Sequence, residues 1–141
     1  MENVRIYLAG GMTGLNLDEQ MKWRVRFGNA ITTQFDISKK PLVFIPPYYY
    51  SPSMDAHKSE REVMEFELAQ LRKSDVVVVN FNVPKSIGTA MELMVAKENK
   101  IPVIGLNEER HELHPWLIEC CTRICDNFRE LAEHIAYFYL K

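Results

Sequence analysis

Two acidic residues are the positions in this sequence whose type and spacing could support chemistry. Glu92 follows a loop that contains Ser86 and Gly88, and Glu67 lies upstream in a helix-like segment. Two carboxyl groups at one site can divide the cleavage of a glycosidic bond, because one attacks the anomeric carbon while another group handles the leaving group's proton. These residues are therefore compatible with glycosyl chemistry.

A second interpretation of Glu92 stays open. Thr89 and Glu92 have the spacing of a capping box, in which the glutamate satisfies a backbone N–H at the start of a helix. We expect Glu92 in the first turn of a helix that runs from Thr89 to about Asn99, where the helix dipole favours an ionised carboxylate. Ionisation suits a nucleophile, so the pattern alone leaves both roles open.

Glu67 belongs to a predicted helix over Ser59–Lys73, whose start fits a capping box formed by Ser59 and Glu62. The apolar stripe of this helix consists of Val63, Met64, Leu68 and Leu71. Glu67 falls on or beside that stripe. A glutamate on the inward face of a helix must be paired, protonated or functional, because burying an unpaired charge is costly.

A glycine-rich segment follows the first predicted strand, Val4–Ala9. It contains Gly10, Gly11 and Thr13, but its spacing matches neither the dinucleotide-binding fingerprint nor the P-loop. Glycines still let a ligand approach the backbone closely, and Thr13 adds a hydroxyl. The segment is therefore either part of a binding site or an ordinary tight turn.

Three consecutive tyrosines, beginning at Tyr48, come after a second predicted strand over Leu42–Ile45. Aromatic rings placed after a strand end can wall a pocket and stack on a planar ligand. They can equally pack a long loop or form a subunit contact. We keep Tyr48 as a candidate substrate-binding residue.

The element that must position Glu92 is the segment Ser74–Leu106. Asp75–Asn80 contains four valines in a row, which is typical of a strand buried on both faces. A loop, a helix and a second apolar run over Ile101–Ile104 complete a right-handed βαβ unit. Ligands bind beyond the carboxyl ends of parallel strands, so Asn80–Glu92 lies where a ligand would sit.

The other predicted elements continue the alternation of strand and helix. They are a first helix over Asp18–Gln34, a short helix from His114, a strand over Thr122–Cys125, and a last helix over Asn127–Leu140 capped by Asp126. The apolar stripe of the first helix is Met21, Val25, Gly28 and Ile31 or Thr32, with Trp23 and Phe27 alongside. This alternation predicts a three-layer α/β, flavodoxin-like (Rossmann-like) fold of about five mostly parallel strands in the order 2-1-3-4-5. Residues 1–141 are expected to form a single domain.

Composition excludes several functional classes. The chain has 141 residues with a net charge of −2, so no basic excess indicates nucleic acid or an anionic membrane surface. No apolar run approaches the ~20 residues that span a bilayer, and the N-terminus does not resemble a secretory signal. We expect a cytoplasmic protein whose three cysteines are reduced. No cluster of ligating side chains indicates a metal, and no cofactor is expected.

Taken together, these motifs carry a resemblance. The sequence Ile6-Tyr7-Leu8-Ala9-Gly10-Gly11, Glu67 eight positions before Asp75, and Gly88-Thr89-x-x-Glu92-Leu93-x-x-Ala96 are similar to the nucleoside 2-deoxyribosyltransferase superfamily, which includes 2′-deoxynucleoside 5′-phosphate N-hydrolase-like members. The similarity runs from about residue 4 to 106. It implies a flavodoxin-like enzyme that cleaves the N-glycosidic bond of a 2′-deoxynucleoside or its 5′-monophosphate.

The resemblance also implies roles for individual residues. Glu92 would be the nucleophile that forms a deoxyribosyl–enzyme, and Tyr7 would orient it. Glu67, at a position usually held by aspartate, would work near the base and the sugar. Gly10, Gly11, Thr13, Gly88 and Tyr48, chosen from the patterns described above, are the candidate substrate-binding residues. The sugar would pass to another base in a transferase or to water in a hydrolase.

One departure bears on the substrate. The base-exchanging transferases typically carry aspartate six residues before the nucleophile, whereas this sequence has Ser86 there, as in relatives that hydrolyse 5′-monophosphates. A hydroxyl accepts a phosphate better than a carboxylate does, because like charges repel. A free 5′-hydroxyl could also bind Ser86.

Family members complete the pocket with a residue from a neighbouring subunit, and His114 resembles that residue by position. Its alternative role is simply to start a helix. We expect a homo-oligomer, at least a dimer. A non-catalytic nucleotide-binding or sensor domain of the same fold is the alternative to an enzyme, and a structural or interaction module is a third class.

Overall fold

The computed structural model describes residues 2–12, 15–46 and 58–141. Within these residues, parallel strands form a five-stranded sheet in the order β2-β1-β3-β4-β5, as the sequence predicts. The strands are β1 (Asn3–Gly10), β2 (Lys40–Phe44), β3 (Val76–Asn80), β4 (Val103–Leu106) and β5 (Arg123–Cys125). The valine run therefore lies in the middle of the sheet, between β1 and β4.

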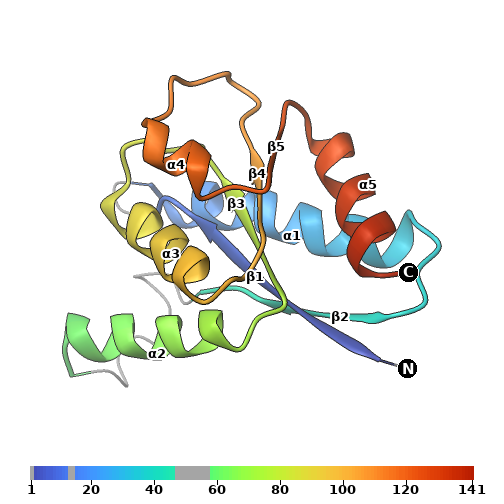
Figure 1. The fold of residues 1–141 in the computed structure, drawn as a ribbon, viewed down its shortest axis with the longest axis horizontal. Coiled ribbons are helices and arrows are strands. Elements are labelled where there is room, and N and C mark those ends of the chain that lie inside the picture. Colours follow the sequence, from blue (N-terminus) through green and yellow to red (C-terminus); the bar gives the residue numbers. More distant parts are fainter. Residues whose placement is uncertain (1, 13–14, 47–57) are drawn as a thin grey trace.

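Helices cover both faces of the sheet. They are α1 (Leu17–Thr33), α2 (Glu60–Arg72), α3 (Ile87–Glu98), α4 (Pro115–Glu119) and α5 (Phe128–Tyr139). Figure 1 shows α1 and α5 on one side, and α2, α3 and α4 on the other. This is the three-layer α/β arrangement predicted from the alternation of elements.

Successive residues of the central strands point into two separate apolar layers. Ile6, Leu8 and Val78 face α1 and α5, where they pack with Phe27 and Leu131. The alternate side chains of the same strands face α2 and α3, and include Tyr7, Ala9, Val77 and Val79. Because side chains alternate along a strand, a strand buried on both faces must be apolar throughout.

The first helix is rotated relative to the predicted stripe. Val25 of that stripe was wrong, since it is 49% exposed, whereas Ile31 is buried, as are Trp23 and Phe27, which were expected alongside. The buried face runs through Gln20, Trp23, Arg24, Phe27, Ala30 and Ile31. The two aromatic rings of this helix fill more of the space above the sheet than Met21 and Val25 would, and they set the rotation of the helix.

Two helix starts also differ from expectation. The N-cap of α5 is Asn127 rather than Asp126, and its side chain accepts a hydrogen bond from the Glu130 N–H at 2.8 Å. The third helix begins at Ile87, earlier than the predicted start at Thr89. By contrast, the predicted cap of α2 is confirmed, because the Ser59 hydroxyl accepts from the Glu62 N–H.

Candidate active site

A cavity of about 410 Å³ opens at the carboxyl ends of β1 and β3. Every layer of the fold contributes to its wall: α1 provides Arg24, α2 provides Glu67, and α3 provides Glu92. The strand-end loops supply Gly10, Gly11, Met12, Val83, Lys85 and Ser86, and Pro46, Val63, Ile87, Gly88 and Thr89 complete the lining. The cavity therefore lies where the parallel sheet predicts that a ligand would bind, and both candidate carboxyl groups line it.

Tyr7 and Glu92 are in direct contact. Tyr7 lies in β1, is completely buried, and donates a short hydrogen bond from its hydroxyl to Oε2 of Glu92. On its other side the Tyr7 ring stacks on Phe44 of β2, with 5.4 Å between the ring centroids. Since the packed core fixes the phenol, the carboxylate of Glu92 is held in one orientation, with one oxygen bound by Tyr7 and the other without a hydrogen bond to any described residue.

Glu92 lies in the second turn of α3, so the expectation of a first-turn position was wrong. The N-cap of the helix is Ser86, whose hydroxyl accepts from the Thr89 N–H, and the first turn contains no acidic residue. The capping interpretation of Glu92 fails for the same reason. The carboxyl is half-buried, and burial raises the pKa of Glu92 to about 8, although the Tyr7 hydroxyl and Arg24 lower it. This contrasts with the easily ionised carboxylate expected from the helix dipole.

Glu67 is the second carboxyl group of the cavity. It is half-buried on α2, between Val63 and Leu71, and burial raises the pKa of Glu67 to about 7 while Arg24 lowers it. Within the described residues, no hydrogen bond or ion pair is formed by its carboxyl group. Glu67 is therefore free to exchange a proton with a bound molecule near neutral pH.

The two strand-end loops fit each other closely. A Cβ atom at Gly11 would lie only 2.5 Å from Cβ of Val83, so no other residue fits there without moving a loop. The side-chain oxygen of Asn82 accepts from the N–H groups of both Gly11 and Val83, at 3.3 and 3.1 Å. Glycine at position 11 thus serves close packing of the loops that form the cavity wall.

Ser86 and Gly88 line the cavity where α3 begins. The Ser86 hydroxyl accepts from the Thr89 N–H at 3.3 Å and from the Thr89 hydroxyl at 3.0 Å. Its own proton is left to donate elsewhere. Among the described residues, no atom beyond the chain neighbours and the backbone of the same helix lies within 4 Å of a Cβ built at Gly88, so this part of the chain leaves the backbone there open to a ligand.

Arg24 is the residue of this cavity that the sequence analysis missed. Its side chain is fully buried, and its Nη2 atom donates to the carbonyl oxygen of Gly10 at 3.3 Å. The available signal was the spacing of Trp23, Phe27 and Ile31, which places position 24 on the buried face of α1. A charged residue on a buried face is uncommon and indicates a partner or a function.

The remaining predicted binding residues lie elsewhere or outside the described part. Thr13 and Tyr48 fall in the undescribed ranges. His114 does not line the cavity of Glu92 in the same chain; it caps α4, with Nδ1 accepting from the Trp116 N–H at 3.1 Å. It lines a neighbouring apolar cavity of about 730 Å³, between α3 and α4, which shares Lys85, Ser86 and Ile87 with the first.

Residues 2–12, 15–46 and 58–141 contain no group of three His, Cys, Asp or Glu side chains close enough together to form a metal site. Cys120, Cys121 and Cys125 are free thiols, as predicted. No helix among the described residues is long and apolar enough to cross a membrane.

Comparison with known proteins identifies a sequence family and several solved structures with the same fold. Residues 4–105, most of the chain, match the family described as "Domain of unknown function (DUF4406)". A conserved protein from Enterococcus faecalis V583 superposes with a TM-score of 0.75 at 18% identity, covering 94% of this chain and 96% of the other. No curated protein matches the sequence.

Two further structures have named activities. The 2-deoxyribosyltransferase of Bacillus psychrosaccharolyticus has a TM-score of 0.64 at 12% identity, covering 92% of this chain and 90% of the other. The CMP N-glycosidase of Clostridium botulinum has a TM-score of 0.58 at 18% identity, covering 95% and 98%. The resemblance to the nucleoside 2-deoxyribosyltransferase superfamily is thereby confirmed at the level of the fold.

Proposed function

We propose that this chain, which belongs to the DUF4406 family, is an enzyme that cleaves the N-glycosidic bond of a 2′-deoxynucleoside or its 5′-monophosphate through a covalent deoxyribosyl–Glu92 intermediate. The observation that carries the proposal is the hydrogen bond from Tyr7 to Glu92, beside Glu67, in a cavity at the strand ends. Support comes from solved structures of the same fold, which include a 2-deoxyribosyltransferase and a CMP N-glycosidase.

In the first step, the free oxygen of ionised Glu92 attacks C1′ of the sugar. The C1′–N bond breaks, and its electron pair leaves with the base. Tyr7 donates to the other oxygen of Glu92, which leaves one oxygen to attack and holds the carboxylate in position. The product of this step is a glycosyl ester on Glu92 and a free base.

Glu67 handles the proton in this scheme. A base leaves more easily once it is protonated, and a carboxyl with a pKa of about 7 can provide that proton at neutral pH. In the second step water or another base attacks C1′, Glu92 departs as a carboxylate, and Glu67 accepts the proton released by the incoming group. Two displacements at the same carbon retain its configuration.

The 5′ end of the substrate is assigned to the start of α3. There Ser86 has a proton to donate, Gly88 leaves the backbone open, and Lys85 lines the cavity. These groups, next to a helix N-terminus, suit an anion. We therefore propose that a 5′-monophosphate binds better than the free nucleoside.

The test is incubation of the purified protein with a panel of 2′-deoxynucleosides and their 5′-monophosphates, with and without a second free base, followed by chromatography. Release of the base by the wild type and a covalent sugar adduct detected by intact-protein mass spectrometry are expected. New nucleoside in the presence of the second base identifies a transferase, and free deoxyribose or its phosphate identifies a hydrolase. Binding without any cleavage would replace the proposal with a nucleotide-binding domain.

A further inference from the structure

The proposed reaction leaves Arg24 without a role, although its surroundings need an explanation. Its guanidinium is fully buried, with Nη1 donating to the carbonyl oxygen of Gln20 and Nη2 to that of Gly10. Its Nε atom has no hydrogen-bond partner among the described residues. The ion pairs found within the same residues do not include Arg24. A buried positive charge in this state requires a negative charge nearby.

The available negative charges lie in the same cavity. Glu67 reaches it from α2 and Glu92 from α3, while Arg24 belongs to α1 on the opposite side of the sheet. The guanidinium passes over the end of β1, at Gly10. A Cβ at Gly10 would lie 3.3 Å from the Trp23 ring and 3.5 Å from Nη2 of Arg24, so glycine keeps this passage open.

The charge balance of the cavity includes groups from every element around it. Tyr7 of β1 donates to Glu92, Glu60 of α2 acts on Glu67, and Lys85 lines the cavity from the loop before α3. The two carboxyl groups and Arg24 together are neutral when one carboxyl is ionised and the other is protonated. A low-dielectric cavity favours that neutral combination over one with two ionised carboxylates.

We propose, on the basis of the proposed function, that Arg24 is a positioning residue whose buried charge keeps one of the two carboxyl groups ionised while the other retains its proton. Glu92 must be the ionised member when it attacks the sugar, and the hydrogen bond from Tyr7 favours this, because a donor stabilises a carboxylate. The two carboxyl groups then have the opposite protonation states that attack by one and proton donation by the other require.

Arg24 acts on both carboxyl groups. Burial raises the pKa of Glu92 to about 8 and that of Glu67 to about 7, and Arg24 lowers both. Before substrate enters the cavity, the higher pKa places the proton on Glu92, so that proton must pass to Glu67 when substrate binds and Glu92 attacks. Burial also lowers the pKa of Arg24, to about 10, so the guanidinium remains charged at neutral pH. Without Arg24, burial would act on both carboxyl groups with less opposition, and neither would ionise readily at pH 7.

The experiment follows the ionisation of Glu92 by NMR of protein labelled with ¹³C at the glutamate carboxyl, with the signal assigned by its loss in Glu92→Gln. Three variants are compared with the wild type. Arg24→Met removes the charge, Arg24→Lys keeps it, and Lys22→Met removes a charge from an exposed position of the same helix as a matched control. The pH dependence of kcat/KM is recorded for each variant on the best substrate found.

In Arg24→Met the ionisation of Glu92 should move upward by about one pH unit or more, since an opposite charge nearby has effects of this size. The acid limb of kcat/KM should move with it. Arg24→Lys and Lys22→Met should titrate as the wild type does. A folded Arg24→Met in which Glu92 ionises at the wild-type pH would overturn the proposal.

Arg24→Met could fail to fold, because it leaves the carbonyl oxygen of Gly10 without its donor. Arg24→Gln, whose amide can still donate to that oxygen, then removes the charge in its place: an upward shift of about one unit in the ionisation of Glu92 supports the role of the charge, and a wild-type titration contradicts it. The titration needs no substrate. Absence of turnover with the expected titration would therefore reject the proposed function and leave the role of Arg24 standing.

Discussion

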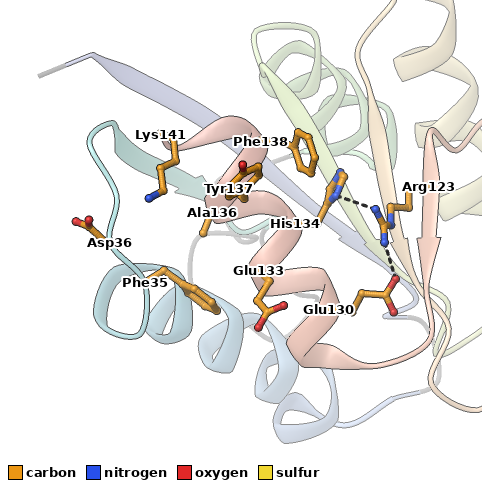
Figure 2. A pocket seen from close by; sticks show the side chains of 10 residues that line it. All are labelled: Phe35, Asp36, Arg123, Glu130, Glu133, His134, Ala136, Tyr137, Phe138 and Lys141. Carbon is orange, nitrogen blue, oxygen red and sulfur yellow. Dashed lines mark hydrogen bonds and ion pairs between the residues drawn. The ribbon is translucent and has the colours of Figure 1, made fainter.

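Two cavities of nearly equal volume show that size does not distinguish the site. The candidate active site measures about 410 Å³, and a cavity beside α5 measures about 420 Å³. Both are lined in part by charged side chains, and the α5 cavity also has the aromatic rings of Phe35, Tyr137 and Phe138. Figure 2 shows the α5 cavity, where Arg123 of β5 reaches Glu130 and His134 of α5.

The two cavities differ in how deeply their charged groups are buried. Nη2 of Arg123 lies 3.0 Å from the Glu130 carboxylate, and the two side chains are 46% and 35% exposed. Such surface pairs contribute only about 0–1 kcal/mol. In the candidate site, by contrast, a fully buried Arg24 faces two carboxyl groups whose pKa values burial has raised to about 7 and about 8. Titratable groups with pKa values perturbed by burial are typical of functional sites, which is why the first cavity rather than the second is the candidate site.

The largest contrast is expected for the nucleophile. Glu92→Gln should lower turnover by about 10³-fold or more, because the covalent step is lost while the shape of the cavity is kept. The matched change in the other cavity, Glu130→Gln, should leave turnover unchanged. Steady-state kinetics of the two variants provide the measurement. Near-normal turnover in Glu92→Gln would end the covalent mechanism.

A smaller contrast is expected for the proton donor. Glu67→Gln should slow base release by roughly 10²-fold or more, because the amide cannot supply a proton. Glu133→Gln, on the wall of the α5 cavity, is the control. Activated substrates whose base leaves without protonation should restore most of the rate in Glu67→Gln. An equal loss with both kinds of substrate would assign Glu67 to binding instead.

Ser86→Ala tests the 5′ end of the substrate. A charge-assisted hydrogen bond contributes about 1.5–3 kcal/mol, so a preference of about tenfold or more in kcat/KM for a 5′-monophosphate over its nucleoside should collapse. The variant also loses the cap of α3, and Asn127→Ala, which loses the cap of α5, controls for the lower stability. Equal use of both substrates by the wild type would favour a base-exchanging transferase.

Stability should depend on pH through the candidate site. The folded protein keeps a proton on Glu92 up to a pH of about 8, whereas the unfolded chain releases it near its ordinary pKa of about 4.3. Stability should therefore fall as pH rises between these values, by about 1.4 kcal/mol per pH unit for each extra bound proton. The free energy of unfolding, measured with urea across this pH range, should fall less steeply with pH in Glu92→Gln than in Glu130→Gln. Parallel curves would show that Glu92 is not buried as described.

The smallest effect on the chemistry itself is expected at the subunit contact. We predict a homo-oligomer, at least a dimer, formed through aromatic surface such as Trp116, which is 74% exposed beside the apolar α3–α4 cavity. Trp116→Ser should weaken association, and Phe138→Ser, an equally exposed change at the α5 cavity, should not. Light scattering at micromolar concentration measures both. A fully active monomeric wild type would contradict the assembly and a role for His114 from a partner.

The fold could be predicted because its signals are strong and local. Four consecutive valines strongly predict a strand that is covered on both faces, and each predicted strand is followed by a segment with the apolar period of a helix. The start of α3 was harder to predict, because Ser86 and Thr89 are both good capping residues. The turn in which the Ser86 N–H donates to the Val83 carbonyl decides in favour of Ser86, and it depends on the loop rather than the helix.

The candidate site could be predicted only in part. Glu92, Glu67 and Tyr7 were identified by pattern and by resemblance, and the structure brings them together. Arg24 was missed because the rotation of α1 is set by the fit of Trp23 and Phe27 to the sheet, which is a property of the packed layers. Arg24 lines the same cavity as Glu67 and Glu92 although their helices lie on opposite faces of the sheet. A local sequence pattern cannot predict such a long-range arrangement.

Tyr7 ties the reactivity of this protein to the rigidity of its interior. The same ring that touches Glu92 is packed between β2 and the α2–α3 layer, against Phe44. If heat or a substitution of Phe44 loosens that layer, the hydrogen bond from Tyr7 to the Glu92 carboxylate should therefore weaken before the chain unfolds. Activity should consequently decline at temperatures below the melting transition. Substitutions of the residues that line the cavity should therefore be better tolerated than substitutions in the apolar layer that holds Tyr7.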